Sequence, residues 1–162
     1  HSEGEGRSRI VGEMTHFIDL LNSITGSSIS RVHAERIGGD NQSAVNNDNI
    51  AVTFKFEEGS VANLTYAASG DKAYSREKIE IFYEGNTVVS EDFRISKKHF
   101  GGKTETFKTH GQEMGYREEL KHFISLIKGE ESKVTLNEAF QTMRTVLAIE
   151  TSLSTGQAIR LS

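Results

Sequence analysis

The order of apolar and polar positions divides the chain into a first helix, a run of strands and two final helices. At the start, apolar side chains recur every three or four residues, at Ile10, Met14, Phe17, Ile18, Leu21 and Ile24. This spacing places them on one face of an α-helix. Gly26 occupies the position at which a glycine commonly ends a helix. The pattern therefore predicts one amphipathic helix that ends at Gly26.

Alternating residues then predict a hairpin in the first half of the chain. Residues 29–37 alternate loosely, whereas residues 50–56 alternate strictly, and a Glu57-Glu58-Gly59 turn leads into a strand over residues 60–68. A three-residue loop with Gly59 in the left-handed conformation would pair Phe56 with Ser60. This register places Val52, Phe54, Ala62, Leu64 and Tyr66 on one face, and Thr53, Lys55, Val61, Asn63, Thr65 and Ala67 on the other.

Further strands are predicted in the middle of the chain. Residues 77–83 and 87–93 form a second hairpin around Glu84-Gly85-Asn86, and residues 103–110 add another strand. Between them lies a short basic cluster, which we interpret as the solvated edge of a strand or loop; it consists of Arg94, Lys97, Lys98 and His99.

Two helices and a short strand over residues 158–161 are predicted to close the chain. The first helix has one apolar stripe made of Tyr116, Leu120, Phe123, Ile124 and Ile127, and it ends near Gly129. Thr135 and Glu138 have the spacing of a capping box, which predicts the start of the second helix. The second helix should end at Gly156 and bury Leu136, Phe140, Met143, Leu147 and Leu153.

This order of elements is typical of the α+β class, with a meandering sheet and helices packed on one face. The 162 residues fit one domain over residues 1–162. The chain has no cysteine, which excludes disulfides, zinc–thiolate sites and thiol catalysis. A net charge of −4 with scattered basic residues argues against nucleic acid as a partner. No apolar run approaches the roughly 20 residues of a membrane span, and we expect a cytoplasmic protein.

The first helix also carries the candidate chemistry. Glu13 and His16 are three residues apart and therefore share a helix face, and Asp19 follows after another three. A histidine flanked by carboxylates can act as a general acid/base, because the carboxylates fix its tautomer and tune its pKa. The alternative is a half-buried structural histidine that is hydrogen-bonded to a neighbour. A single Glu-x-x-His motif falls short of a carboxylate-bridged metal site, which needs two, so we expect no metal.

No segment of the chain matches a dinucleotide-binding turn. The run Gly4-Glu5-Gly6-Arg7-Ser8-Arg9 lacks the third glycine and a preceding strand, and Gly101-Gly102-Lys103 is not part of a P-loop pattern. We therefore expect no cofactor to bind this chain alone.

Several segments together resemble a known family. The run Gly6-Arg7-Ser8-Arg9-Ile10-Val11-Gly12-Glu13-Met14-Thr15-His16-Phe17-Ile18-Asp19-Leu20-Leu21 resembles the first helix of the C-terminal domain in the glucose–fructose oxidoreductase/inositol dehydrogenase (Gfo/Idh/MocA) family. The likeness continues through Asp48-Asn49-Ile50-Ala51-Val52-Thr53-Phe54, Glu58-Gly59-Ser60-Val61-Ala62-Asn63-Leu64, Gly70-Asp71-Lys72, Glu91-Asp92-Phe93-Arg94 and the two closing helices. It covers nearly the whole chain.

The resemblance implies an α+β domain built on a large, mostly antiparallel sheet, which binds the substrate and forms the oligomer. Its N-terminal Rossmann partner domain, which would bind NAD or NADP, is expected to be absent from this chain. The resemblance also implies an NAD(P)-dependent oxidoreductase that acts on a sugar, nucleotide sugar or cyclitol hydroxyl and forms a homo-oligomer through the sheet face, with the fragment alone inactive. His16 matches the family histidine that lies near the substrate and often transfers a proton, and Glu13 would orient it or the substrate.

Two positions depart from the commoner family pattern. Gly12 stands where an aspartate is usual, with Glu13 as a substitute, and Met14 stands where a glycine is common. The alternative function is therefore a non-enzymatic assembly or ligand-binding module with a decayed active site. Gly12 favours this alternative, and the retained His16 opposes it.

Overall fold

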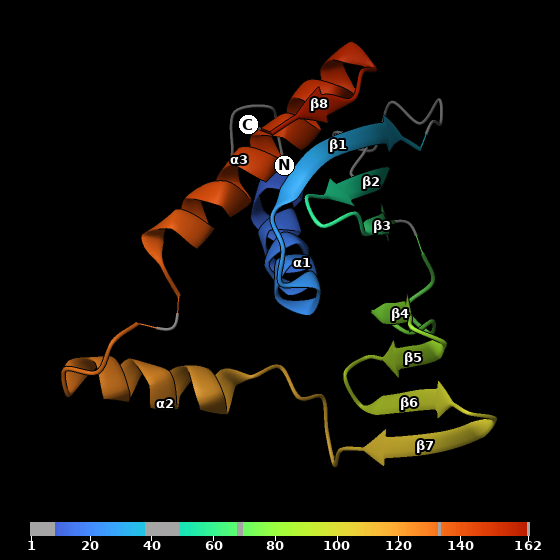
Figure 1. Cartoon of the computed structure of the whole chain (residues 1–162), viewed down its shortest axis with the longest axis vertical. Coiled ribbons are helices and arrows are strands. Elements are labelled where there is room, and N and C mark those ends of the chain that lie inside the picture. The colour runs from blue at the N-terminus through green and yellow to red at the C-terminus, as the bar shows by residue number, and fades with distance from the viewer. Residues whose placement is uncertain (1–8, 38–48, 68–69, 133, 162) are drawn as a thin grey trace. The chain divides into compact units, whose positions relative to one another are not determined.

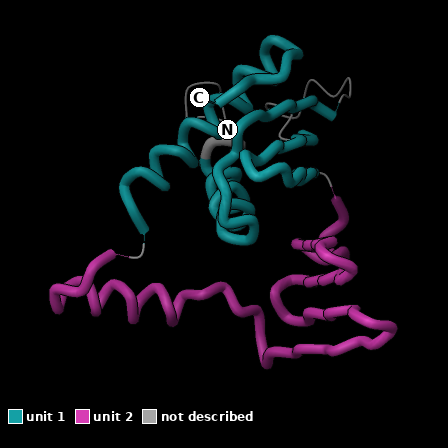
Figure 2. The backbone as a smooth tube through the Cα atoms, in the orientation of Figure 1, with its two compact units in different colours: residues 1–69, 134–162 teal, residues 70–133 magenta. Residues whose placement is uncertain are grey.

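The structure is a computed structural model that describes residues 9–37, 49–67, 70–132 and 134–161. Residues 1–8, 38–48, 68–69, 133 and 162 lie outside the described residues. The chain divides into two compact units, which Figure 2 shows in different colours. Unit 1 comprises residues 1–69 and 134–162, and unit 2 comprises residues 70–133. Each unit contains a four-stranded antiparallel sheet, which confirms the α+β class.

Unit 1 is a sheet with two helices on one side. Its strands, in spatial order, are β3 (Val61–Tyr66), β2 (Ile50–Phe56), β1 (Ile29–Arg36) and β8 (Ile159–Arg160). The helices are α1 (Arg9–Thr25) and α3 (Leu136–Thr155), and α3 contacts both β1 and α1 (Figure 1). Gly26 follows α1 with a φ of 63°, which confirms the predicted helix end.

The hairpin register predicted from the Glu57-Glu58-Gly59 turn is confirmed. Phe54 pairs with Ala62 and Val52 pairs with Leu64, while the backbone N–H of Phe56 donates to the carbonyl of Ser60 at 3.0 Å. Gly59 has a φ of 110°, a backbone conformation that residues other than glycine rarely adopt. The turn therefore determines which face of both strands meets the helices.

The core of unit 1 lies between that sheet face and the two helices. Alternate residues of β1 and β2 meet residues of α1 and α3 there, and the fully buried apolar side chains among them are Met14, Ile18, Val32, Ile50, Phe54, Val146 and Ile149. On β2 and β3 the opposite sheet face exposes Thr53, Val61, Asn63 and Thr65, which we call the open face. Lys55 and the β1 residues Arg31, His33 and Glu35 lie on the same side of the sheet. Across the open face, the Thr53 hydroxyl donates to Asn63 Oδ1 at 2.9 Å.

The predicted buried side of α3 is wrong for four of its five residues. Leu136, Phe140, Met143 and Leu147 are 41–88% exposed, and only Leu153 packs partly against the core. The side that meets β1 and α1 is instead formed by Thr142, Thr145, Val146, Ala148, Ile149 and Ser152. The three hydroxyl groups are buried because each finds a hydrogen-bond partner.

Unit 2 is a meander of four strands followed by a helix. The strands β4 (Lys78–Tyr83), β5 (Asn86–Glu91), β6 (Ile95–Phe100) and β7 (Lys103–Lys108) lie side by side in chain order. The predicted three-residue turn between β4 and β5 is in fact the two-residue turn Glu84-Gly85, since Asn86 pairs with Tyr83. Both turn residues have positive φ, at 44° and 75°, as a type I′ turn requires.

The basic cluster at residues 94–99 is also corrected by the structure. Most of it belongs to β6, which lies between β5 and β7 and is therefore an inner strand rather than a strand or loop edge. The helix α2 (Tyr116–Ile127) occupies the predicted range. Its apolar stripe is exposed, with relative exposures of 51–71%, and none of the described residues 70–132 is buried.

Candidate functional site

The predicted site residues lie on the outward side of α1. Successive residues of an α-helix are rotated by about 100°, so residues three apart are separated by about 60° around the axis. Met14 and Ile18 are completely buried and define the inner side of α1. His16 points away from them and is exposed, while Glu13 is partly buried and lies one turn before it. The helix thus brings His16 and Glu13 onto neighbouring positions of one face.

His16 makes no hydrogen bond to Glu13 or Asp19 within the described part of the chain, although the helix holds all three in sequence along its outer side. Its imidazole is therefore open to an incoming molecule. A half-buried histidine that hydrogen-bonds a neighbour, which was the structural alternative, does not describe this side chain. Histidine is the side chain that general acid/base catalysis uses most often, and it must be accessible to the reacting molecule to do so.

Two contacts brace α1 on opposite flanks of this outward side. On one flank, the ring of Phe17 meets Tyr66 of β3 edge-to-face, with 6.3 Å between the ring centroids and 62° between the ring planes. On the other flank, the hydroxyl of Thr142 on α3 donates to Asp19 Oδ1. No local pattern predicts this second contact, because the two residues are 123 positions apart.

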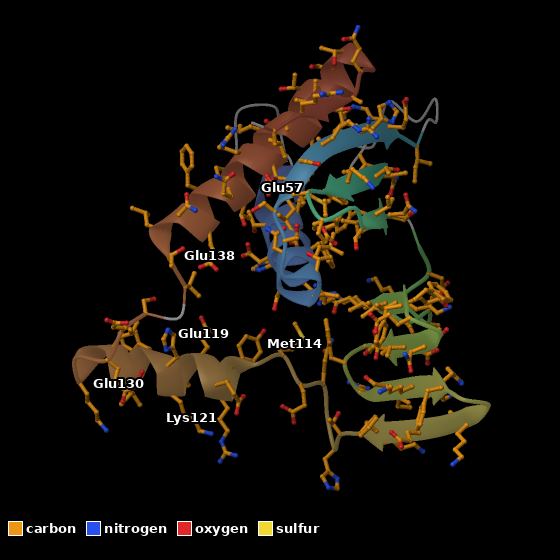
Figure 3. All side chains as sticks on the ribbon, viewed as in Figure 1. Glu57, Met114, Glu119, Lys121, Glu130 and Glu138 are labelled. Atoms are coloured by element: carbon orange, nitrogen blue, oxygen red, sulfur yellow. The ribbon has the colours of Figure 1, made fainter. Side chains whose placement is uncertain are left out.

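The helix α3, whose Thr142 donates to Asp19, is itself fixed near both ends. At its start, the Thr135 backbone N–H and hydroxyl both donate to Glu138 Oε2, at 2.7 and 2.9 Å, which confirms the predicted capping box. Figure 3 labels Glu138 at this end of α3. These hydrogen bonds, the backbone one first, lower the pKa of Glu138 below its ordinary value. Near the other end, Ser152 Oγ accepts the backbone N–H of Ala34 in β1 at 2.9 Å.

The position before Glu13 has room for a side chain. Gly12 is exposed, and a Cβ placed on it would meet no atom within 4 Å. Space therefore does not explain why glycine stands where the commoner family pattern has aspartate. Among the described residues, no three histidine, aspartate or glutamate side chains gather as a metal ion would require.

A shallow hollow in unit 2 contains none of the predicted residues. It is lined by the turn ends of its strands, including Thr87, His99, Lys103 and Thr104. His99 Nδ1 lies 2.9 Å from the Thr104 hydroxyl, so this histidine is already engaged within the hollow. The hollow is open to solvent and adds no candidate chemistry to that of α1.

Comparison with known proteins identifies the family. Residues 6–161 match the family model described as the oxidoreductase family, C-terminal alpha/beta domain. The chain belongs to the Gfo/Idh/MocA family. Among curated proteins, none matches the chain in sequence.

Solved structures share the Gfo/Idh/MocA fold at low sequence identity. An aldose-aldose oxidoreductase from Caulobacter crescentus, complexed with glycerol, matches 91% of this chain with a TM-score of 0.72 and 17% identity. A UDP-N-acetylglucosamine 3-dehydrogenase from Acidithiobacillus ferrooxidans matches 86% with a TM-score of 0.72 and 15% identity. An oxidoreductase from Agrobacterium radiobacter, in complex with NAD+, L-tartaric acid and magnesium, matches 90% with a TM-score of 0.73 and 13% identity.

The Gfo/Idh/MocA chain described here spans about half the length of these relatives, with 45–47% of each relative covered. In the described part of the chain, no helix combines the length and apolar character needed to cross a membrane.

Proposed function

We propose that this chain is the substrate-binding and oligomerisation domain of an NAD(P)-dependent oxidoreductase that acts on a sugar, nucleotide-sugar or cyclitol hydroxyl, in the cytoplasm. In the whole protein, a nucleotide-binding half would hold the nicotinamide cofactor. His16 would take the proton of the substrate hydroxyl, the nicotinamide would accept the hydride from the carbon that bears this hydroxyl, and Glu13 would orient His16 or the substrate.

The observation that carries the proposal is the exposed His16 on a braced helix of a family domain matched over residues 6–161. A general acid/base must reach its substrate, and a side chain on the outer side of α1 is accessible to one. The relatives add support, since one is a nucleotide-sugar dehydrogenase and another was solved with NAD+.

A non-enzymatic assembly or ligand-binding module is the second candidate, because Gly12 removes the usual carboxylate at a position with room for it. A substrate screen on the whole protein separates the two candidates. Reduction of NAD+ or NADP+ with a sugar, nucleotide sugar or cyclitol, followed by nicotinamide absorbance, supports the enzyme. Binding of such compounds without any turnover supports the module.

The isolated chain should bind neither NAD nor NADP, since the expected nucleotide-binding half lies outside it. Isothermal titration calorimetry of the chain with each dinucleotide tests this. Micromolar binding of either dinucleotide would contradict the proposal that the nucleotide-binding half, and not this chain, holds the cofactor.

The open face is the proposed surface for self-association. Its side chains on β2 and β3 are small or uncharged apart from the neighbouring Lys55, so two copies of the sheet could meet there across a two-fold axis. Thr65→Arg places a charge there and should convert an oligomer into monomers in light scattering. The matched control is Thr106→Arg, which changes an equally exposed strand threonine in unit 2. A monomeric wild type, or an oligomer that survives Thr65→Arg, would count against this surface.

A further inference from the structure

We propose that the hydrogen bond between Thr142 and Asp19 sets the direction in which α1 presents His16, so that both are positioning residues for the proton transfer. This inference rests on the proposed function of His16. It also assigns a role to Thr142, which neither the helix pattern nor the family match singles out.

Thr142 lies under α1 and is only 4% exposed. A buried hydroxyl without a hydrogen-bond partner is costly, so such a group is normally paired. The hydroxyl of Thr142 donates to Asp19 Oδ1, and the acceptor lies on the exposed flank of α1. The contact therefore joins the inside of α3 to the outside of α1.

This contact acts where the apolar packing of α1 gives little directional control. Met14 and Ile18 anchor the helix in the core through the hydrophobic effect, which is not directional. A hydrogen bond has a preferred geometry and resists rotation of the helix about its axis. Asp19 lies one turn after His16, about 60° around the axis, so a rotation that breaks this bond also swings the imidazole.

Small displacements of a catalytic group have large kinetic consequences. A shift of 1 Å in a reacting group can lower the rate about a hundredfold. Loss of the Thr142 hydroxyl should therefore reduce turnover while leaving substrate affinity and the core packing of α3 largely unchanged.

Thr145 supplies a matched control on the same helix. It is 3% exposed, and its hydroxyl donates to the backbone carbonyl of Gln141 at 2.9 Å, within α3 itself. Thr142→Val and Thr145→Val thus remove the same atom from equally buried positions. Only the first change breaks a bond to α1. Thr142→Ser keeps the hydroxyl and serves as the rescue variant.

The test is performed on the whole protein with the substrate found by the screen. We expect Thr142→Val to lower kcat about tenfold with KM changed less than about twofold, Thr145→Val to keep the wild-type kcat, and Thr142→Ser to restore it. The ring resonance of His16 in NMR spectra should shift in Thr142→Val alone and return in Thr142→Ser.

Asp19 separates a positioning role from a direct charge effect. Asp19→Asn keeps an oxygen acceptor for Thr142 and should retain most of the activity, whereas Asp19→Ala should behave like Thr142→Val. A large loss in Asp19→Asn, equal to that in Asp19→Ala, would show that the negative charge is what matters and would overturn the positioning role.

The outcomes also distinguish the positioning role of Thr142 and Asp19 from the acid/base role of His16. Equal kcat and an equal His16 resonance in Thr142→Val and Thr145→Val would overturn the positioning role alone, provided that His16→Asn is impaired. A fully active His16→Asn would remove the proposed acid/base role of His16 and the positioning role together.

Discussion

Unit 1 and unit 2 each contain a four-stranded antiparallel sheet, but they bury their side chains very differently. In unit 1, α1 and α3 cover one sheet face and produce a cluster of completely buried residues. In unit 2, none of the described residues is buried, and the strands are joined by tight turns with positive φ. Packing therefore specifies unit 1, whereas turn geometry and backbone pairing specify unit 2. The candidate site belongs to the unit with the core, where a rigid scaffold can hold it.

The largest difference should appear on truncating one phenylalanine in each unit. Phe54 is completely buried in unit 1, and Phe54→Ala should lower the free energy of unfolding by about 3–5 kcal/mol. Phe82 of unit 2 is 73% exposed, and Phe82→Ala should change the free energy of unfolding by less than about 0.5 kcal/mol. Urea titration of both variants measures the contrast, and equal losses would break the comparison.

A buried hydroxyl of unit 1 should give the next largest effect. Ser152 is completely buried, accepts the backbone N–H of Ala34 and donates to the carbonyl of Gln157. Ser152→Ala leaves both groups without this partner and should cost about 1–3 kcal/mol. Ser154→Ala is the control, because that side chain is exposed and bonds only within its own helix. Similar denaturation midpoints for the two variants would argue against a role for Ser152 in joining α3 to β1.

Unit 2 should instead be sensitive at its turns. Gly85 has a φ of 75°, and Gly85→Ala should weaken the β4–β5 hairpin by about 1 kcal/mol, since an alanine is strained in that conformation. Gly70→Ala in the same unit has no positive φ to accommodate and should be close to neutral. Hydrogen exchange reports the effect at the amides of β4 and β5. Equal protection in both variants would mean that turn geometry does not control this sheet.

A smaller, pH-dependent effect is expected at the start of α3. The folded-state pKa of Glu138 is lowered, so its stabilising contribution is present above the ordinary glutamate range and is lost as pH falls through the lowered pKa. The stability difference between wild type and Glu138→Gln should therefore shrink towards zero in acid. Thr135→Ala keeps the backbone donor and should retain most of the dependence. Thermal unfolding measures the stability of both proteins across the pH range. A stability difference between wild type and Glu138→Gln that stays constant with pH would contradict this account.

Local patterns predicted those features whose determinants lie close together in the sequence. The turn at Gly59 is sufficient to predict the register of β2 and β3, and the capping box is sufficient to predict the start of α3. The buried face of α3 was predicted wrongly, because hydropathy alone selects Leu136 and Phe140 over Thr142 and Ser152. The hydroxyl groups of those two residues are satisfied by Asp19 and Ala34, which are 123 and 118 positions away.

The candidate site was predictable to a similar extent. Spacing on one helix was enough to bring Glu13 and His16 to one outer face, because both residues belong to α1. The contact that braces this helix was not predictable, since Thr142 comes from another element and has no distinctive pattern around it.

The most direct test of a proton-transfer role for His16 is the turnover of His16→Asn in the whole protein, compared with His110→Asn. His110 lies in unit 2 and is also exposed, so it controls for the loss of an accessible histidine. We predict that His16→Asn lowers kcat at least about tenfold at an unchanged melting temperature, while His110→Asn retains full activity. Full activity in His16→Asn, or an equal loss in both variants, would contradict the assignment of His16 as the general acid/base.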